Sequence, residues 1–402
     1  MSKPARSTGM KKMAESSTAT NLELFFDLVF VFALTQVTAF MAETPTWGGL
    51  GRGALLLAVV WWCWVGYSWL SNLVQADEGL ARTAMLVAMG AMFGVAIAIP
   101  ESFVDLPGGL HGPTVFAFGY LLVRLVHLWL FWIVARGDQA LRAQLVRFGA
   151  TMAGGTILLL IAAQTSGTAQ VLLWVAAIAA DYGGTVAIGV RGWRIESAKH
   201  FAERHGLILL IALGESIVAI GVGVNLHAIS LPIIIAAALG LTVSACLWWA
   251  YFDTHSHLSE RALHEAAGEE RTRMGRSAFS YLHLPMVIGI VMLALGMKKV
   301  LNYVAGDKGH TLSDALYGAP LWAMFGGTAL YLLAQAAVSW RCNRMLKTHR
   351  IALGVLLVAI VPLMALLPAL VSLAVLAALL VALIVYEWVK YREQRAEIRA
   401  GH

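Results

Sequence analysis

The chain has 402 residues, of which 59% are apolar and 13% are charged, with a net charge of +6. Soluble domains carry about 25% charged residues, so a soluble protein of this length would lack the polar surface that water requires. The positive residues form no separate basic domain, which excludes a typical nucleic-acid-binding protein. Together with the mean hydropathy of +0.74, this composition predicts an all-α polytopic membrane protein.

In chain order, a basic tail at residues 1–20 comes first. The apolar run after it contains Glu23 and Asp27 and has no small-residue cleavage site, so we expect a retained helix and not a signal peptide. About 20 residues, each rising about 1.5 Å, cross about 30 Å of hydrocarbon. We predict about 12 spans and a polar tail at 393–402, and we divide the last apolar stretch at its prolines. The predicted spans are 23–42, 53–71, 80–99, 113–135, 145–164, 168–190, 205–225, 230–252, 278–297, 314–338, 350–366 and 369–389.

Lysine and arginine residues gather on one side of these spans. With the N-terminus in the cytoplasm, 24 of them fall on the cytoplasmic side and 4 on the outer side, while Arg124 lies inside a span. Because cytoplasmic loops hold the positive residues, we predict that both termini are cytoplasmic and that the protein is multi-pass in the inner membrane. The longest loop, 253–276, is predicted to form a short cytoplasmic helix.

The two halves of the chain share short motifs in the same order. The matched segments are Glu23 with Glu203, Trp61-Trp62 with Trp248-Trp249, and Arg82-Thr83-Ala84 with Arg276-Ser277-Ala278. These matches predict two parallel six-helix repeats, at 21–200 and 201–392, related by an axis along the membrane normal. Chance similarity between apolar segments is the alternative.

Acidic residues inside the first span are the first candidates for a functional site. A charge in a span costs about 2.5 kcal/mol or more on insertion scales. Glu23 and Asp27 lie one turn apart on one helix face and repel each other, so at least one of them needs a proton or a cationic partner. A structural ion pair near the inner boundary is the alternative reading.

A second group of charges lies near the middle of the membrane. Arg124 in the fourth span shares a helix face with His127, and Glu215 lies near the midplane in the seventh span. We expect Arg124 to pair with a carboxylate, and Asp27, Asp181 and Glu215 compete for that role. A buried pair of this kind can also serve packing alone.

Histidines give two further hypotheses. His283 lies in the ninth span on one face with Arg276, where it can relay protons or donate a packing hydrogen bond. A metal site is a second hypothesis, although the zinc-protease motif H-E-x-x-H is absent. Its candidate residues are His200, Glu203, His205, His255 and His257. The alternative is that these are ordinary solvated groups at the cytoplasmic ends of spans.

Several longer motifs resemble those of one bacterial family. They are E-L-F-F-D-L-V-F-V-F-A-L-T-Q at Glu23–Gln36, R-T-A-M-L at Arg82–Leu86, E-R-H-G-L-I-L-L-I-A-L-G-E-S-I at Glu203–Ile217, W-W-A-Y-F-D at Trp248–Asp253 and H-L-P-M-V-I-G-I-V at His283–Val291. With these motifs in one order, the chain resembles the bacterial low temperature requirement A (LtrA) family across most of its length. The family is named for a growth phenotype, and the resemblance implies no catalytic residue.

The first motif is also similar, more distantly, to the first-helix signature of the endolysosomal and bacterial potassium-channel family marked by Phe-Ser-Asp. The shared residues include Glu23, Phe25 and Asp27. The chain differs at Phe26, where that family has a small hydroxyl residue, and again at His205-Gly206-Leu207 in the second half. This resemblance implies six-helix repeats whose first helices line a pore.

We therefore expect a transport protein, either a channel or a secondary carrier, that moves a cation or a proton past intramembrane acidic residues. The expected partners are the lipid bilayer and that ion, with no cofactor and no nucleic acid, and a homodimer is left open. Two alternatives remain. One is an intramembrane metal-dependent or lipid-modifying enzyme, and the other is a membrane stress-response component that transports nothing.

Overall fold

The computed structural model describes residues 17–75, 77–223, 227–393 and 395–396. The regular structure of these residues is helical, apart from isolated bridge residues. The positive residues of the predicted basic tail and the end of the C-terminal tail lie outside the described residues. The chain forms two compact units. Unit 1 lies within residues 1–36, 55–204 and 266–275, and unit 2 lies within residues 37–54, 205–265 and 276–402.

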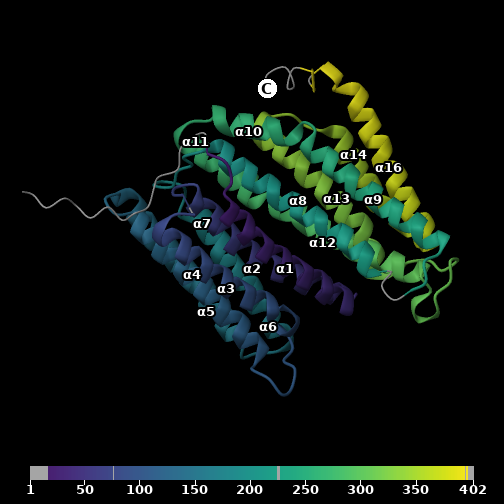
Figure 1. The fold of residues 1–402 in the computed structure, drawn as a ribbon, viewed down its shortest axis with the longest axis horizontal. Coiled ribbons are helices and arrows are strands. Elements are labelled where there is room, and N and C mark those ends of the chain that lie inside the picture. Colours follow the sequence, from purple (N-terminus) through teal and green to yellow (C-terminus); the bar gives the residue numbers. More distant parts are fainter. Residues whose placement is uncertain (1–16, 76, 224–226, 394, 397–402) are drawn as a thin grey trace, which may run out of the picture. The chain divides into compact units, whose positions relative to one another are not determined.

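Unit 1 includes the first part of α1 (Asn21–Glu43), most of α2 (Trp47–Ser71) and the start of α8 (Ala198–Gly223). Its other elements are α3 (Gly79–Ile97), the 3-10 turn η1 (Ile99–Glu101), α4 (Gly112–Val134), α5 (Gln139–Ala162), α6 (Gly167–Ile178), the π-helical turn η2 (Ala179–Gly183), α7 (Gly184–Ala187) and α11 (Gly268–Met274). Within this unit α3 packs on α4, α4 on α5 and α5 on α6, as the blue helices of Figure 1 show.

Unit 2 contains the end of α1, the start of α2 and the rest of α8. Its other elements are α9 (Leu231–Phe252), α10 (His255–Glu265), the π-helical turn η3 (Gly275–Tyr281, whose first residue belongs to unit 1), α12 (His283–Val304), the 3-10 turn η4 (Asp307–Gly309), α13 (Gly318–Asn343), α14 (Thr348–Ala359), α15 (Val361–Met364) and α16 (Ala369–Lys390). In unit 2, α12 packs tightly against α13, where glycines allow the two backbones to touch. A Cβ atom added at Gly289 would lie 2.5 Å from the carbonyl oxygen of Gly327.

The helices have the length and composition of membrane spans. Among the described residues, eleven helices are long and apolar enough to cross a bilayer. The helical membrane-protein character predicted from composition is thus confirmed, while the number of about 12 spans stays a prediction. The predicted span at 350–366 falls on α14, which has 12 residues, and on the short α15. The predicted loop helix at 253–276 forms two helices, α10 and α11.

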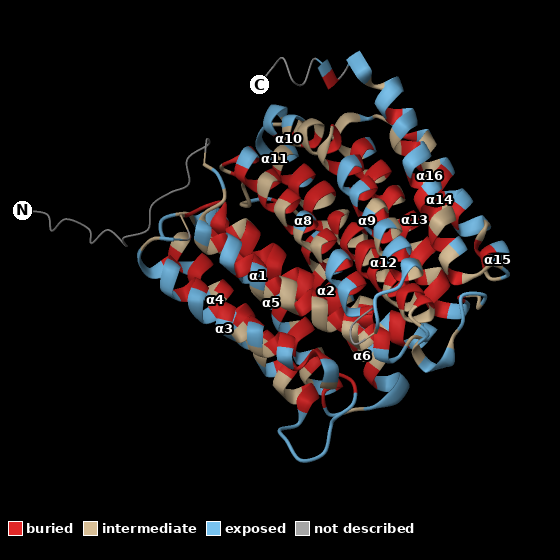
Figure 2. Cartoon of the chain, turned by 45° about the vertical axis from the view of Figure 1, so that its right-hand side comes forward, coloured by how far each residue is buried: buried red, intermediate tan, exposed pale blue. Residues whose placement is uncertain are grey.

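Large apolar side chains cover the outside of these helices. Figure 2 shows many exposed positions on α16, and three of them are Val385, Trp388 and Val389. In a membrane protein such side chains face lipid, whereas polar groups are kept inside the bundle. The buried polar groups are therefore the candidates for a functional site.

Candidate functional site

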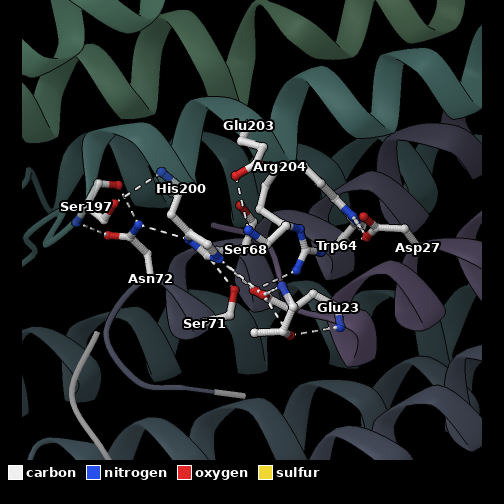
Figure 3. Close-up of polar contacts among 12 residues, drawn as sticks. Glu23, Asp27, Trp64, Ser68, Ser71, Asn72, Ser197, His200, Glu203 and Arg204 are labelled. Carbon is white, nitrogen blue, oxygen red and sulfur yellow. Dashed lines mark hydrogen bonds and ion pairs between the residues drawn. The ribbon is translucent and has the colours of Figure 1, made fainter. Parts of the chain in front are cut away.

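Four charged or titratable side chains meet where α1 and α8 begin. His200 Nε2 lies 2.9 Å from Glu23 Oε1, and Arg204 NH2 lies 2.6 Å from Asp27 Oδ1. Arg204 NH1 also lies 2.8 Å from Glu23 Oε1, so one guanidinium joins both carboxylates (Figure 3). All four side chains are wholly buried. We call Glu23, Asp27, His200 and Arg204 the acidic cluster; it lies within unit 1.

Local sequence explains why the cluster forms at these helix starts. Thr20 and Glu23 form a capping box, because the Thr20 amide donates to Glu23 Oε2 at 2.8 Å and the Glu23 amide donates to Thr20 Oγ1 at 3.3 Å. Ser197 caps α8 in the same way, since its hydroxyl accepts a hydrogen bond from the His200 amide at 3.1 Å. Both helix starts are therefore fixed, and the partners on α1 and α8 stand 177 residues apart in both contacts.

Asp27 is bonded unevenly. The Trp64 indole donates to Asp27 Oδ1 at 2.8 Å, and Arg204 donates to the same oxygen. The other oxygen, Oδ2, is buried and has no hydrogen-bond partner among the described residues. The Trp64 ring stacks on Trp61, with centroids 4.9 Å apart, and Phe30 packs against both rings. The Asp27 carboxylate thus lies beside the stacked rings of Trp64 and Trp61, and its Oδ2 atom accepts no hydrogen bond from the described residues.

His200 is held from the opposite side by Asn72 at the end of α2. The Asn72 amide nitrogen lies 3.2 Å from His200 Nδ1 and donates to the Ser197 carbonyl at 2.7 Å. The Asn72 amide oxygen accepts the backbone N–H groups of Glu196 and Ser197 at 2.8 and 3.3 Å. The orientation of the Asn72 side chain is therefore fixed by the backbone before α8.

The other predicted acidic residue of this region, Glu203, lies on the edge of the cluster. It is half-buried, and its carboxylate accepts the Ala19 amide at 3.1 Å. Figure 3 shows its carboxylate apart from the carboxylates of Glu23 and Asp27. Glu203 thus ties down the segment before α1 and is not a member of the acidic cluster.

The structure pairs Arg124 with Asp181, both buried in unit 1. Arg124 NH2 lies 3.4 Å from Asp181 Oδ1, and the Tyr120 hydroxyl donates to Asp181 Oδ2 at 2.5 Å. Asp181 lies in the π-helical turn η2, close to α5 because position 155 is a glycine, where an added Cβ atom would lie 3.0 Å from the Asp181 carboxyl carbon. Asp27, a competing partner in the sequence prediction, is bound by Arg204 instead.

His127 lies one turn beyond Arg124 but does not bond to it. Its ring is buried between aromatic rings, with centroids 5.4 Å from Tyr67 and 4.9 Å from Phe131. Neither ring nitrogen has a hydrogen-bond partner among the described residues. His127 therefore packs among aromatic rings in unit 1.

The predicted residues of unit 2 lie in separate places. His283 Nε2 lies 3.0 Å from the Tyr251 hydroxyl, and His283 Nδ1 lies 2.9 Å from the Ala278 carbonyl oxygen, so the ring is held between α9 and η3. Its centroid lies 5.3 Å from that of His205. His255 is buried against Ser339, with 3.1 Å between His255 Nδ1 and Ser339 Oγ.

The remaining predicted residues lie at four separate positions. Glu215 is buried in α8, and the next residue along, Ser216, shares a 2.8 Å hydrogen bond with Ser244 of α9. His257 is half-buried. Of the repeat-related arginines, Arg82 is exposed and Arg276 is half-buried.

The metal hypothesis rests on histidines that the structure distributes over both units. His200 belongs to unit 1, and His205, His255 and His257 belong to unit 2. Throughout the part of the chain that the structure describes, no group of three or more His, Cys, Asp or Glu side chains is placed to hold a metal ion. The acidic cluster is the densest group of charges that the structure brings together in unit 1.

Sequence reasoning missed an ion pair in unit 2. Arg350 of α14 binds both carboxylate oxygens of Glu387 of α16, at 2.7 and 2.8 Å, and also binds Gln335 Oε1 and the Ala250 carbonyl oxygen. Arg350 had counted only as one more cytoplasmic positive residue. A glutamate inside the last apolar stretch was the available signal.

Arg204, Trp64 and Asn72 were also missed. Arg204 stands one helical turn after His200, on the same face of α8. Glu23 and Asp27 have the same spacing on α1. The two carboxylates of α1 therefore face the His200 and Arg204 side chains of α8 in register. This complementary spacing was the signal that could have found Arg204.

Comparison with known proteins places these motifs in a family. The model of the family described as bacterial low temperature requirement A protein (LtrA) matches residues 18–385. The chain is also 28% identical over 331 residues, 79% of its length, to the uncharacterized protein RA0937 of Rhizobium meliloti (strain 1021), of which 78% is covered. No solved structure matches the chain. Because the family match spans nearly the whole chain, including every residue of the acidic cluster, the protein belongs to the bacterial low temperature requirement A (LtrA) family.

Proposed function

We propose that this LtrA-family protein moves a cation or a proton across the membrane, and that the acidic cluster is its ion-binding site. One observation carries the proposal: two wholly buried carboxylates, one turn apart on α1, share a single guanidinium. The resemblance of α1 to the first helix of the Phe-Ser-Asp potassium-channel family agrees with this proposal, but the proposal does not depend on it.

The charges of the cluster do not cancel. Glu23 and Asp27 each contribute one negative charge when ionised, Arg204 contributes one positive charge, and His200 contributes none while its ring is neutral. An uncompensated charge in a medium of low polarity is costly, by several kcal/mol even after relaxation. The cluster is therefore stable only when one more positive charge joins it, and a mobile ion can supply that charge.

A balanced buried ion pair in the same chain has a different form. Arg350 and Glu387 are one cation and one anion, joined by two parallel hydrogen bonds that satisfy both carboxylate oxygens. That pair is balanced and leaves no carboxylate oxygen free. The acidic cluster is unbalanced and leaves Asp27 Oδ2 free, which is the form expected of a site that exchanges an ion.

The proposal is tested by ion flux into proteoliposomes that hold the purified full chain. We expect flux driven by a proton, Na⁺ or K⁺ gradient in the wild type, and its loss in Asp27→Asn and Glu23→Gln. Asp138→Asn is the matched control, because it makes the same chemical change at the N-cap of α5, outside the cluster. Counterflow, in which unlabelled ion on one side of the membrane speeds the uptake of labelled ion from the other side, would distinguish a carrier from a channel.

Two outcomes would contradict the proposal. The first is the absence of flux in every gradient from folded, reconstituted protein. The second is flux that the two cluster variants retain in full, because the ion would then cross elsewhere.

A further inference from the structure

We infer that the ion that completes the acidic cluster is a proton, that Oδ2 of Asp27 holds it, and that Asn72 makes this necessary by keeping His200 neutral. This inference rests on the proposed function for its role in transport. Its evidence is the hydrogen-bond geometry around His200 and Asp27.

The first step is the orientation of Asn72. Two backbone N–H groups, of Glu196 and Ser197, point at one atom of its side-chain amide. Only the amide oxygen can accept them, so the NH₂ group must lie on the other side. That NH₂ group faces the Ser197 carbonyl oxygen and His200 Nδ1.

The second step is the protonation of His200. An NH₂ group can only donate, so His200 Nδ1 must accept and carries no proton. The ring is then neutral, and its one proton is on Nε2, where it is donated to Glu23 at 2.9 Å. Since His200 adds no charge, Glu23, Asp27 and Arg204 together carry one negative charge when both acids are ionised.

The hydrogen bonds of the four carboxylate oxygens of Glu23 and Asp27 show where a proton can bind. Glu23 Oε1 faces His200 and Arg204, and Glu23 Oε2 accepts hydrogen bonds from Thr20. Asp27 Oδ1 accepts from Trp64 and Arg204. Of the four carboxylate oxygens, Asp27 Oδ2 alone is without a donor among the described residues.

This geometry favours a proton over a metal cation. Hard cations in proteins take about six or more oxygen ligands, whereas three of the four carboxylate oxygens here already face hydrogen-bond donors. A proton needs one oxygen only. Among the described residues, the charged groups that face Asp27 are Glu23 from α1 and Arg204 from α8, and α2 contributes the uncharged Trp64. Within this part of the chain, Arg204 is thus the one permanent cation beside the proton.

Infrared spectroscopy tests the location of the proton directly. A protonated carboxylic acid has a C=O stretching band that an ionised carboxylate lacks. We expect this band in the wild-type full chain near neutral pH and its loss in Asp27→Asn. The band should also be lost in Glu23→Gln, because Arg204 then balances the one remaining carboxylate. In the wild type, ¹³C labelling of aspartate carboxyls should shift the band and ¹³C labelling of glutamate carboxyls should leave it unchanged. Asp181→Asn is the control, because it removes another buried aspartate of unit 1 and should leave the band in place. If Asp27→Asn does not fold, ¹³C labelling of aspartate carboxyls in the wild type must still shift the band.

Nitrogen NMR tests the role of Asn72. We expect His200, assigned by comparison with His200→Gln, to be the neutral Nε2–H tautomer in the wild type. In Asn72→Asp a carboxylate oxygen replaces the NH₂ group, so we expect His200 to gain a proton on Nδ1 and become an imidazolium.

The results separate this inference from the proposed function. A band that Asp27→Asn leaves unchanged, or a His200 imidazolium in the wild type, would overturn the inference even if flux is observed. Loss of the band in Asp27→Asn without any flux in proteoliposomes would support the inference and contradict transport.

Discussion

The guanidinium of Arg204 lies 2.6 Å from Oδ1 of Asp27, and neither side chain is exposed. The contact joins α8 to α1 across 177 residues of sequence. It also leaves Arg204 as the one permanent positive charge beside two carboxylates, because an arginine does not lose its proton in proteins. The stability of unit 1 and the ion site therefore depend on the same side chain.

Replacing Arg204 by methionine is expected to destabilise the protein by about 3–5 kcal/mol, because two buried carboxylates lose their only permanent cation. Thermal unfolding in detergent measures this effect. Adding Glu23→Gln to Arg204→Met should recover part of the loss, since Glu23 is the carboxylate that stays ionised when Asp27 holds the proton. A single variant as stable as the wild type would contradict the geometry of the cluster.

Arg350→Met is expected to cost about 3–5 kcal/mol as well, because Glu387 would remain buried without its bidentate partner. Arg350→Lys should restore little, since a lysine cannot form two parallel hydrogen bonds with one carboxylate. Arg261→Met is the control, because it breaks an exposed i,i+4 pair with Glu265 and should change the unfolding temperature little. We expect these variants, once folded and reconstituted, to keep wild-type flux per molecule.

Tyr120→Phe is expected to destabilise unit 1 by about 1–3 kcal/mol, because Asp181 Oδ2 would lose its hydroxyl donor inside the bundle. The matched control is Tyr67→Phe, which removes a hydroxyl that donates to the uncharged Val123 carbonyl oxygen at 2.9 Å. Its cost should be smaller, about 0.5–1.5 kcal/mol. Equal losses in the two variants would show that the charge of Asp181 plays no part.

Lys347, between α13 and α14, predicts a dependence of stability on pH. Burial, together with the nearby Arg350, lowers the pKa of Lys347 from 10.5 to about 8. The unfolded chain therefore binds this proton more tightly than the folded protein, so stability should rise as the pH rises from about 7 toward about 10. Thermal unfolding of the wild type and of Lys347→Met over this pH range tests this prediction. The difference in unfolding temperature between the two proteins should change with pH, and a difference that stays constant would contradict the lowered pKa of Lys347.

The predicted orientation can be tested with single cysteines placed in a cysteine-free chain. A cysteine at Gly108, in the loop between α3 and α4, should react with a membrane-impermeant thiol reagent applied outside the cell. A cysteine at Gly268, the first residue of α11, should react only after lysis. The reverse pattern would overturn the cytoplasmic placement of both termini that the positive residues predict.

Helix positions were largely predictable, because crossing hydrocarbon requires an apolar run of fixed length. The predicted span at 230–252 corresponds to α9 at Leu231–Phe252, and that at 369–389 corresponds to α16 at Ala369–Lys390. The region between Thr348 and Pro368 was harder, since its prolines interrupt the helical hydrogen bonds and divide it into α14 and α15. Hydropathy alone cannot show whether such a segment crosses the membrane.

The partners of the buried charges were not predictable from hydropathy. The i and i+4 spacing of Glu23 and Asp27 indicated that a cation or proton was needed, but it could not name Arg204, which stands at the start of α8 and resembles any cytoplasmic arginine. Asp181 became the partner of Arg124 through a π-helical turn, which apolar periodicity does not reveal. Sequence motifs matched Glu23 with Glu203, whereas the helix caps align Thr20 with Ser197 and Glu23 with His200.

Charge movement after a pH jump, recorded from proteoliposomes adsorbed to a solid support, tests most directly whether the acidic cluster exchanges an ion. The account predicts a transient current in the wild type and in Asp138→Asn, and none in Asp27→Asn. A current of wild-type size in folded Asp27→Asn would contradict the account.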